Sequence, residues 1–505
     1  MGTISKNFSY KEFEESETAV RKGIANVINT TEIRDSVKAL VLNVLQPLRD
    51  AWGKPLHINS GYRCPALNEA VGGVPDSQHC FDDMTEILTD KGWRSNETIS
   101  LDDKVFTYNF STSKIELKPI NEIIRRQFNG RLYRISGKQI DVVCTDKHNV
   151  IVKYDYHKYK RRGSNKISPE GQAYFDSLKT DNDKWHLEKM QDVVGKRRQF
   201  MTCGYSTEKP NYDVEFMRFI MAVVSDGYFG SHCGVTPFIG FHVKKERKII
   251  YLCNLMDELE IRYSLRRHKD GTVYFYIGKK YAEKALGIIG KGKNLPTYIL
   301  KADSDTLRRL IDTYIFFDGH KDKRQNNIGM SIVTVNSHNA SILQAMCVLS
   351  GMRCVLGSRE GICGTILGKK VKKAQRVYCL SICPDLTSSK MGEKSSEIVD
   401  YNGEVWCIRD DNDTVIIRRN GRVSIQGNCK GEAADLDVGE KSDNLRLFEL
   451  AANSDLPFDQ LINEFDGEWV HISHKNGGTQ RGQILESKRG KNGKTYYTDI
   501  TKKYR

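Results

Sequence analysis

The stretch Ser-Gln-His-Cys at residues 77–80 and the stretch Asn-Cys-Lys-Gly-Glu-Ala-Ala-Asp at residues 428–435 decide how this chain is organised. If His79 is joined directly to Cys429, the two stretches give Ser-Gln-His-Cys-Lys-Gly-Glu-Ala-Ala-Asp, a pattern of the form SxHxxGxAxD. The pattern is complete only when residues 80–428 are removed. We therefore interpret those residues as an insertion that interrupts another domain.

Length and composition agree with several domains in one chain. A chain of 505 residues is too long for one compact domain and predicts two to four. Thirteen cysteines, an odd number, do not indicate a disulfide framework. No apolar run reaches about 18 residues, and the N-terminus lacks the apolar core of a signal peptide. We expect a monomer that is made in the cytosol and has no membrane partner.

The positive charge is confined to the middle of the chain. The formal net charge is +14, with 0 on residues 1–79, −1 on residues 429–505 and +15 on residues 80–428. A basic segment between neutral flanks predicts a polyanionic partner for that segment alone. A solvated basic surface without a partner is the alternative.

The two flanks carry the marks of one enzyme domain. Apolar residues recur at helical spacing over 31–52, and a short strand is expected near residues 56–60. The joined SxHxxGxAxD pattern, the Glu-Trp-Val-His stretch at 468–471 and the Ser-Gly-Tyr-Arg stretch at 60–63 resemble the D-alanyl-D-alanine carboxypeptidase family of zinc metallopeptidases. The resemblance implies that residues 1–79 and 429–505 form one small α+β domain with an antiparallel sheet.

The same residues suit zinc chemistry. Catalytic zinc needs three protein ligands and an open position for water, and His79, Asp435 and His471 would supply them. Glu468 would be the general base. The resemblance further implies that Arg63 and Ser77 hold the substrate, a peptidoglycan stem peptide. Residues 468 and 471 of an ideal strand face opposite sides, so we expect a bulge or turn at Gly467–Glu468. His474 is a possible competing ligand.

The insertion has its own signature at both ends. It begins with Cys80, contains the Thr145-Asp-Lys-His148 pattern, and ends with Asn428 directly before Cys429. These features resemble the inteins, whose Hint fold is all-β. Short alternating runs at 142–152 and 415–425 agree with strands.

Each of these residue types has a chemical role in protein splicing. The Cys80 thiol can attack the His79 carbonyl and form a thioester, while Thr145 and His148 polarise the bond and protonate the leaving amide. Cys429 then takes the acyl group, and cyclisation of Asn428 releases the insertion. No cofactor is expected for splicing.

Three features depart from the intein pattern, one of which is the absence of the usual upstream His, with Asn412-Asp413 nearby. Inteins usually carry His before the terminal Asn, and here that position is Gly427. Cys407 stands where many family members have Asp. We therefore expect that cyclisation of Asn428 is assisted in a different way.

The insertion is much longer than a Hint domain requires. Residues 219–229 and 310–319 are two apolar segments that end in Asp-Gly, and they resemble the paired helices of LAGLIDADG homing endonucleases. The resemblance implies a DNA endonuclease, active or decayed, in which Asp226 and Asp318 hold Mg²⁺ beside the phosphates of double-stranded DNA. Lys293 matches the lysine block of that family, and residues 334–354 match its following helix. Two buried helices with acidic ends are the alternative.

The predicted fold class is therefore multi-domain: an α+β zinc peptidase split by an all-β Hint intein that carries an α+β LAGLIDADG endonuclease. The expected segments are 1–79 and 429–505 for the peptidase, 80–205 and 386–428 for the splicing region, and 206–385 for the endonuclease. A stable unspliced insertion, a hedgehog-like autocleaving protein and a non-catalytic zinc module remain alternatives. A peptidase without a signal peptide suggests a phage-encoded protein that is released to the cell wall.

Overall fold

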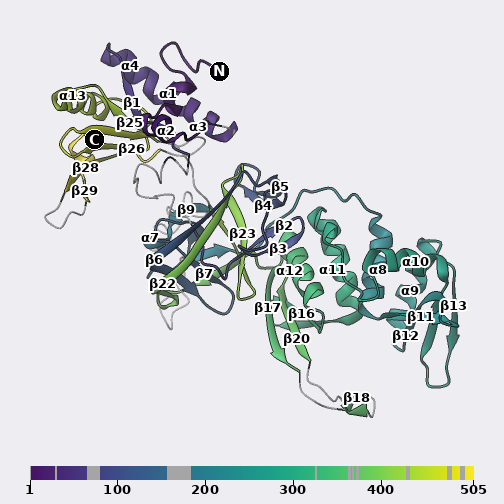
Figure 1. The fold of residues 1–505 in the computed structure, drawn as a ribbon. Coiled ribbons are helices and arrows are strands. Elements are labelled where there is room, and N and C mark those ends of the chain that lie inside the picture. Colours follow the sequence, from purple (N-terminus) through teal and green to yellow (C-terminus); the bar gives the residue numbers. More distant parts are fainter. Residues whose placement is uncertain are drawn as a thin grey trace, which may run out of the picture. The chain divides into compact units, whose positions relative to one another are not determined.

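The chain folds into two compact units. Residues 1–77 and 429–505 form the first unit, and residues 78–428 form the second (Figure 1). The computed structural model describes residues 2–28, 31–64, 67, 80–155, 184–324, 327–361, 365–366, 369–370, 375–427, 433–474, 480–489 and 495–504. Four predicted site residues lie outside the described residues, namely Ser77, His79, Asn428 and Cys429.

The first unit is one sheet with helices, and both flanks contribute to it. The strand order is β1-β25-β27-β26-β28-β29. The strands are β1 (His57–Ser60), β25 (Ala433–Asp437), β26 (Gln460–Glu464), β27 (Trp469–Ser473), β28 (Gln483–Arg489) and β29 (Thr495–Asp499). The helical segments are α1 (Tyr10–Glu14), α2 (Glu17–Lys22), α3 (Thr31–Leu40), η1 (Val41–Leu45), α4 (Gln46–Trp52), α13 (Lys441–Ala452) and η5 (Thr501–Lys503).

The prediction of an antiparallel sheet is wrong for one pair of strands, because β26 and β28 run parallel. The antiparallel partner β27 ends beside the start of β26. The next strand, β28, starts at that same end of the sheet and pairs with the other side of β26. It therefore runs in the same direction as β26.

The predicted amphipathic segment 31–52 is helical, with an interruption in its hydrogen bonding. Its apolar stripe is buried in one core with residues of α13 and the sheet, including Leu40, Val44 and Leu48. The middle of the segment, η1, is a π-helical turn. It directly precedes α4, whose second residue, Pro47, has no amide hydrogen for the regular helical ladder. The stripe is therefore core rather than an active-site surface.

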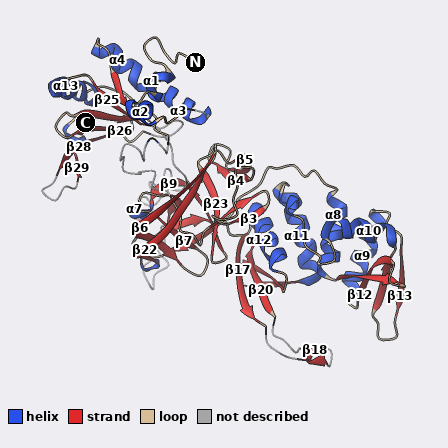
Figure 2. Cartoon of the chain, in the orientation of Figure 1, coloured by secondary structure: helices blue, strands red, loops and turns tan. Residues whose placement is uncertain are grey.

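The second unit contains a part that is almost entirely strand (Figure 2). One sheet has the path β21-β10-β8-β24-β23-β2-β4-β5, and a smaller one has the order β22-β6-β7. The strands of the first are β2 (Glu86–Thr89), β3 (Gly92–Arg94), β4 (Lys104–Asn109), β5 (Lys114–Pro119), β8 (Asn149–Tyr154), β9 (His186–Lys189), β10 (Arg198–Met201), β21 (Ser388–Met391), β23 (Thr414–Arg419) and β24 (Arg422–Gly427). The smaller sheet contains β6 (Glu122–Ser136), β7 (Asp141–Cys144) and β22 (Ser396–Arg409), and the short helices α7 (Met190–Val193) and η4 (Glu393–Ser395) complete this part.

The rest of the second unit is an internal repeat. Each half runs helix, two strands, helix, two strands, and its sheet has the same order of first, second, fourth and third strand. The first half contains α8 (Val214–Ser225), β11 (Gly227–His232), β12 (Thr236–Val243), α9 (Glu246–Glu258), β13 (Tyr263–Arg267) and β14 (Val273–Ile277), followed by α10 (Lys279–Ile289) and η3 (Thr297–Leu300). The second half contains α11 (Ser304–Asp318), β15 (Gly319–Arg324), β16 (Asn327–Thr334), α12 (Ser337–Leu349), β17 (Arg353–Glu360) and β20 (Arg376–Cys383), with the short pair β18 (Thr365–Ile366) and β19 (Lys369–Lys370).

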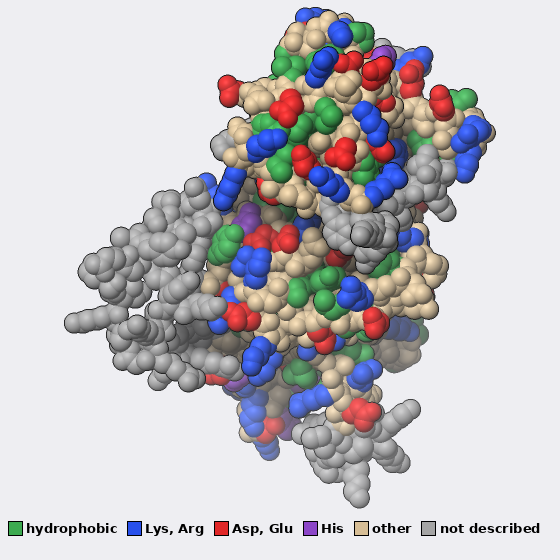
Figure 3. Space-filling view, turned by 90° about the vertical axis from the view of Figure 1, so that its left-hand side faces the viewer, with side chains coloured by type: hydrophobic (Ala, Val, Ile, Leu, Met, Phe, Trp, Pro, Cys, Tyr) green, Lys and Arg blue, Asp and Glu red, His purple; other side chains and the backbone are tan. Residues whose placement is uncertain are grey.

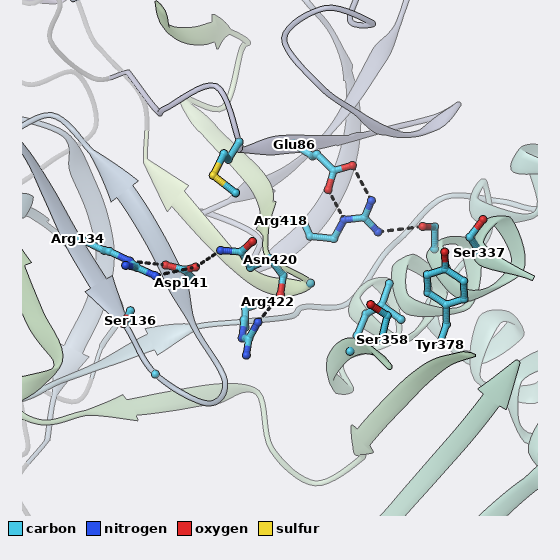
Figure 4. Close-up of a pocket in the computed structure, with 16 residues that line it drawn as sticks. Glu86, Arg134, Ser136, Asp141, Ser337, Ser358, Tyr378, Arg418, Asn420 and Arg422 are labelled. Atoms are coloured by element: carbon cyan, nitrogen blue, oxygen red, sulfur yellow. Dashed lines mark hydrogen bonds and ion pairs between the residues drawn. The ribbon is translucent and has the colours of Figure 1, made fainter. Parts of the chain in front are cut away.

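The strand-rich part and the repeat share one hydrophobic core. Leu88 of β2 and Ile416 of β23 belong to the same buried cluster as residues of α8, α11 and α12. A cavity of about 830 Å³ lies where the turn after β23 meets α12 and β17 (Figure 4). In the part of the chain that the structure describes, no helix is long and apolar enough to cross a membrane.

Candidate active sites

Cys80 lies buried where the chain enters the strand-rich part, and hydrogen bonds of its own and the next residue's main chain hold it there. The residue after it, Phe81, exchanges both backbone hydrogen bonds with Trp406 of β22, at 2.8 and 2.9 Å. The amide of Cys80 donates to Thr145 Oγ1 at 3.3 Å, and the amide of Thr145 donates to the Cys80 carbonyl at 3.1 Å. Cys80 and Thr145 are both 0% exposed. The first predicted nucleophile is therefore fixed against Thr145 through its main chain.

His148 belongs to the same buried cluster. Its amide donates to the Thr145 carbonyl at 3.2 Å, which closes a turn between these two residues. Its ring meets the ring of Phe81 edge-on, with 4.4 Å between the centroids. The structure thus brings together Cys80, Thr145 and His148, although 65 positions separate Cys80 from Thr145 in the chain.

Cys407 is a member of this cluster that the sequence did not assign a role. Its Sγ lies 3.6 Å from the Sγ of Cys80. The hydrogen bond with Cys407 lowers the pKa of the Cys80 thiol against the effect of burial, and the positive charge of Arg126 lowers it further. A thiolate is the nucleophilic form of cysteine, so this environment favours attack by Cys80. The sequence signal that could have indicated a role for Cys407 was a Cys at a position where many inteins have Asp.

The end of the insertion lies close to the same cluster. Gln426 of β24 pairs with Val150 of β8, two positions after His148. A Cβ atom on Gly427 would lie 2.6 Å from Leu187 Cδ2, 2.8 Å from Asn149 Cβ and 3.1 Å from the Asn149 carbonyl oxygen. Glycine is therefore the residue that fits at 427 without a shift of β8 or β9. The absence of the usual histidine has a steric reason in this fold.

Two of the three predicted zinc ligands face each other in the first unit. Asp435 of β25 is the cross-strand partner of His471 of β27, and Asp435 Oδ1 lies 2.8 Å from His471 Nδ1. The two side chains are 28% and 27% exposed, so a ligand can reach them. A carboxylate oxygen and an imidazole nitrogen this close fit the donor set of zinc. No group of three or more His, Cys, Asp or Glu side chains within the described ranges could hold a metal, and the third predicted ligand, His79, lies outside those ranges.

The turn expected before Glu468 is present. Phe465, Asp466 and Gly467 all have positive φ, at 48°, 55° and 87°, and β27 begins only at Trp469. Glu468 therefore lies outside the strand alternation that would point it away from His471. Its carboxylate lies 3.6 Å from Lys441 Nζ and 3.5 Å from an Arg489 nitrogen. Glu468 is thus ion-paired with both cations.

His474 has a structural environment instead of a metal-binding one. It is 6% exposed, its Nδ1 lies 2.6 Å from the Pro457 carbonyl oxygen, and its Nε2 lies 3.2 Å from Asn43 Nδ2. Both ring nitrogens are therefore engaged. The sequence missed Glu464 of β26, a buried carboxyl whose pKa is raised by burial and which interacts electrostatically with His471 and Asp435.

Arg63 lies beside a cavity at the edge of the same sheet. It is exposed and contributes to a cavity of about 460 Å³ whose lining includes Glu15, Glu17, Ser60 and Tyr62. Ser60 at the end of β1 pairs with Asp435. The edge of the cavity therefore adjoins a predicted zinc ligand, and the role of Arg63 in holding a substrate stays a prediction.

The paired helices of the repeat end in the two predicted carboxylates. Asp226 follows the last residue of α8 and Asp318 is the last residue of α11, and these two helices pack together. Burial raises the pKa of Asp318, and the negative charge of Asp226 raises it further. Two carboxylates that repel each other in a half-buried site fit a divalent cation, which has oxygen ligands as its natural partners.

Two lysines converge on these carboxylates. Lys293 Nζ donates to the carbonyl oxygens of Val224 and Gly227, both at 2.9 Å, at the end of α8. Burial lowers the pKa of Lys293, while the charges of Asp226 and Asp318 oppose this shift. Lys248 of α9 forms an ion pair with Asp226. The sequence predicted Lys293 but not Lys248, which lies in a region without a family motif.

The cavity in Figure 4 is a junction between the strand-rich part and the repeat. Arg418 donates to both carboxylate oxygens of Glu86, at 2.6 and 2.7 Å, and to Ser341 of α12 at 3.1 Å. Asn420 and Arg134 both donate to Asp141. These charged and polar groups form hydrogen bonds and ion pairs with one another, so the cavity does not have the features of a catalytic site. On the face drawn in Figure 3, Lys and Arg side chains are interspersed with Asp and Glu.

Comparison with known families identifies the N-terminal part of the chain. Residues 6–98 match the family model described as Peptidase M15. The chain therefore carries a Peptidase M15 domain at its N-terminus. The match runs past His79 into β2 and β3, which belong to the second compact unit. Residues of the C-terminal flank that complete the sheet of the first unit lie outside the match.

The chain is also similar to one curated protein and to several solved structures. The ribonucleoside-diphosphate reductase subunit beta of Aquifex aeolicus (strain VF5) is 23% identical over 369 residues, which cover 69% of this chain. The chain spans about half the length of that relative, 50%. The structure is similar to the homing endonuclease I-DmoI, with 16% identity, a TM-score of 0.24, and coverage of 34% of this chain and 88% of the other. The N-terminal LAGLIDADG domain of DUF199/WhiA gives 10% identity and a TM-score of 0.23, with coverage of 34% and 77%.

Proposed function

We propose that this protein is a self-splicing precursor. Residues 80–428 excise themselves and leave His79 joined to Cys429 by a peptide bond. The observation that carries the proposal is the buried cluster of Cys80, Thr145 and His148 at the point where the chain enters the second unit. A cysteine whose thiol pKa is lowered and whose main chain is held by Thr145 is suited to attack the preceding carbonyl.

The chemistry of the splicing steps follows from these residues. Cys80 Sγ attacks the His79 carbonyl carbon, the peptide C–N bond breaks, and His148 supplies the proton for the amine of Cys80. Cys429 Sγ then displaces Cys80 Sγ from the acyl group. The side-chain amide of Asn428 attacks its own carbonyl and releases Cys429, whose free amine takes the acyl group from its own sulfur. Every bond that breaks is replaced, so no external energy is required.

The arrangement of the flanks supports excision. The sheet of the first unit needs β1 from one flank and β25 to β29 from the other. The second unit has its own core and begins and ends within two residues of the proposed junctions. An insertion that folds by itself can leave without dismantling the domain that it interrupts.

The curated relative supports a mobile insertion. Its match covers 69% of this chain, or about 348 of 505 residues, whereas only 156 residues lie outside 80–428. More than half of the matched residues must therefore lie within the insertion. A segment shared between a chain with a Peptidase M15 domain and a protein named as a reductase subunit is expected of an element that inserts into different hosts.

The ligated flanks are proposed to form a zinc peptidase that cleaves a peptidoglycan stem peptide. His79, Asp435 and His471 would hold the metal, which when bound supplies a Lewis acid and an acidified water. Glu468, which forms ion pairs with Lys441 and Arg489, would accept the proton of the attacking water. Arg63 and Ser77 would hold the substrate. The Peptidase M15 match and the contact between Asp435 and His471 support this assignment.

The repeat within the insertion is proposed to be a homing endonuclease. Its two halves share one topology, and each leading helix ends in an aspartate. Asp226 and Asp318 would hold Mg²⁺, which when bound neutralises charge on a scissile phosphate. Lys293 and Lys248 lie where they can stabilise further negative charge. The expected substrate is the duplex that encodes the uninterrupted junction of His79 and Cys429.

A denaturing gel of freshly expressed protein tests the splicing proposal. We expect two products, of 349 and 156 residues, and a full-length band only when Cys80→Ala is introduced. Asn428→Ala should permit cleavage before Cys80 but leave the insertion attached to residues 429–505. A single stable band of 505 residues from the unaltered chain would favour a stable insertion, and cleavage without a ligated product would favour a hedgehog-like autocleaving protein.

A further inference from the structure

The two sulfurs of the splicing cluster form a pair with a defined register. Because Phe81 and Trp406 exchange both backbone hydrogen bonds, the preceding residue, Cys80, lies opposite the following residue, Cys407. This is a non-hydrogen-bonded antiparallel position, where Cα atoms lie about 4.5 Å apart. Disulfides span Cα separations of about 4.4 to 6.8 Å. The backbone therefore already has the spacing that a disulfide requires.

The side chains of the pair also point to the same side. Cys80 and Cys407 belong to one small buried cluster with Leu132, Val143 and Val405. Their Sγ atoms are 3.6 Å apart, so an approach to about 2.0 Å would form the bond. Cys144 is a third buried cysteine nearby, but it belongs to a different cluster and burial raises the pKa of its thiol. Of these two described cysteines, Cys407 is therefore the one placed as the partner of Cys80.

We propose that Cys80 and Cys407 are a reversible oxidation site that switches splicing off. The inference rests on the proposed splicing function, because Cys80 Sγ is the nucleophile of the first step. When Cys80 Sγ is bonded in a disulfide, it cannot act as the thiolate that attacks the His79 carbonyl. Reduction of the bond returns the nucleophile, so the precursor would be held intact under oxidising conditions and released by a reductant.

The oxidant is a small hydroperoxide, for which hydrogen peroxide is the probe. The Cys80 thiolate attacks one peroxide oxygen, the O–O bond breaks, and hydroxide leaves and becomes water, which gives a sulfenic acid. Cys407 Sγ then attacks the Cys80 sulfur, the S–O bond breaks, and a second water leaves. Two thiols and one peroxide thus give one disulfide and two waters. The lowered pKa of Cys80 favours the first of these steps.

The test uses the full chain with Asn428→Ala and Cys429→Ala, which stops at the thioester. Hydroxylamine cleaves a thioester without reducing a disulfide, so cleavage between residues 79 and 80 reports the free nucleophile. We expect hydroxylamine to cleave the chain after treatment with a phosphine reductant. After peroxide the cleavage rate should fall at least about tenfold, and re-reduction should restore the original rate. Tryptic digestion of the oxidised chain should give peptide 64–91 linked to peptide 395–409, and fragmentation should assign the bond to Cys80.

Two variants provide the controls. Cys407→Ser should give no linked peptide, and its oxidised Cys80 should react with dimedone as a sulfenic acid. Cys144→Ser should retain the link. Absence of the link in the oxidised parent, or equal dimedone labelling of Cys80 in the parent and in Cys407→Ser, would overturn the proposal. The link is scored by mass alone, so a reduced chain that resists hydroxylamine would count against splicing and not against the oxidation site.

Discussion

His57 of β1 lies directly opposite Asp437 of β25, so the sheet of the first unit joins two segments that the entire second unit separates in the chain. The flanks therefore pair before any bond between His79 and Cys429 exists. Splicing would change how the segment that contains His79 is attached, and it would leave the fold of the sheet unchanged. The proposed metal site and the proposed splicing site thus share His79.

Substitution of His471 should remove zinc from the spliced protein, whereas substitution of His474 should not. His471→Ala removes a proposed ligand and should weaken zinc binding by at least about 100-fold. His474→Ala removes contacts to Pro457 and Asn43 and should cost about 1–3 kcal/mol of stability while one zinc stays bound. Metal content after dialysis and urea unfolding measure the two effects. Equal loss of zinc in both variants would make His474 a ligand.

The unspliced precursor should bind zinc much more weakly than the spliced protein. In Cys80→Ala the loop of His79 stays attached to the second unit, and displacements of about 1 Å can cost a factor of about 100 in rate. Zinc content and hydrolysis of a stem peptide should be compared between this precursor and the 156-residue product. Equal values would show that the insertion does not control the peptidase.

Removal of Cys407 should shift the pH dependence of the first splicing step to higher pH. The hydrogen bond with Cys407 lowers the pKa of Cys80, so the reactive thiolate persists to lower pH in the parent chain. In Cys407→Ala the pKa rises and the thiolate is lost at a higher pH. Hydroxylamine cleavage across a pH series measures the midpoint, with Cys144→Ala as the control. An unchanged midpoint would mean that Cys407 does not influence the thiol.

A side chain at position 427 should impair the end of the insertion. Gly427→Ala places a Cβ against Leu187 and Asn149 and should cost about 1–3 kcal/mol of stability through overpacking, with slower release at Asn428. Gly392→Ala is the matched control, because a Cβ there meets nothing within 4 Å. Urea unfolding in the Cys80→Ala background and the rate of C-terminal cleavage provide the readouts. If Gly427→His accelerates release, the steric account is incorrect.

The excised insertion should bind duplex DNA with strong salt dependence, because binding by basic residues releases counterions. The double variant Asp226→Asn and Asp318→Asn should abolish cutting with Mg²⁺ and leave binding intact. Asp312→Asn, an exposed aspartate paired with Lys321, is the control and should cut normally. A binding constant that does not change with salt would contradict the basic-surface argument.

Several features of the fold could be predicted because local patterns determine them. The apolar stripe of 31–52, the turn before Glu468 and the helices that end in Asp226 and Asp318 all follow from residue spacing and main-chain rules. The π-helical turn at Val41–Leu45 leaves no mark in the spacing of apolar residues. The parallel pair of β26 and β28 depends on contacts far along the chain, which periodicity does not encode.

The candidate sites show the same limit. The patterns around Cys80, Thr145 and His148 indicated their grouping, because a known chemistry requires all three. The contact of Cys407 with Cys80 depends on the register of one isolated bridge, and the ion pair of Lys248 with Asp226 on the packing of α9. The hydrogen bond of His474 joins it to the distant residue Asn43. Such contacts across the chain cannot be obtained from spacing.

Mass spectrometry of one tryptic peptide tests the central claim most directly. Ligation of His79 to Cys429 creates a peptide that runs from Cys64 to His79 and continues with Cys429 and Lys430. We predict that this junction peptide is present in the expressed protein and absent when Cys80→Ala is introduced. A chain that yields only the uninterrupted peptide 64–91, with no junction peptide under reducing conditions, would contradict protein splicing.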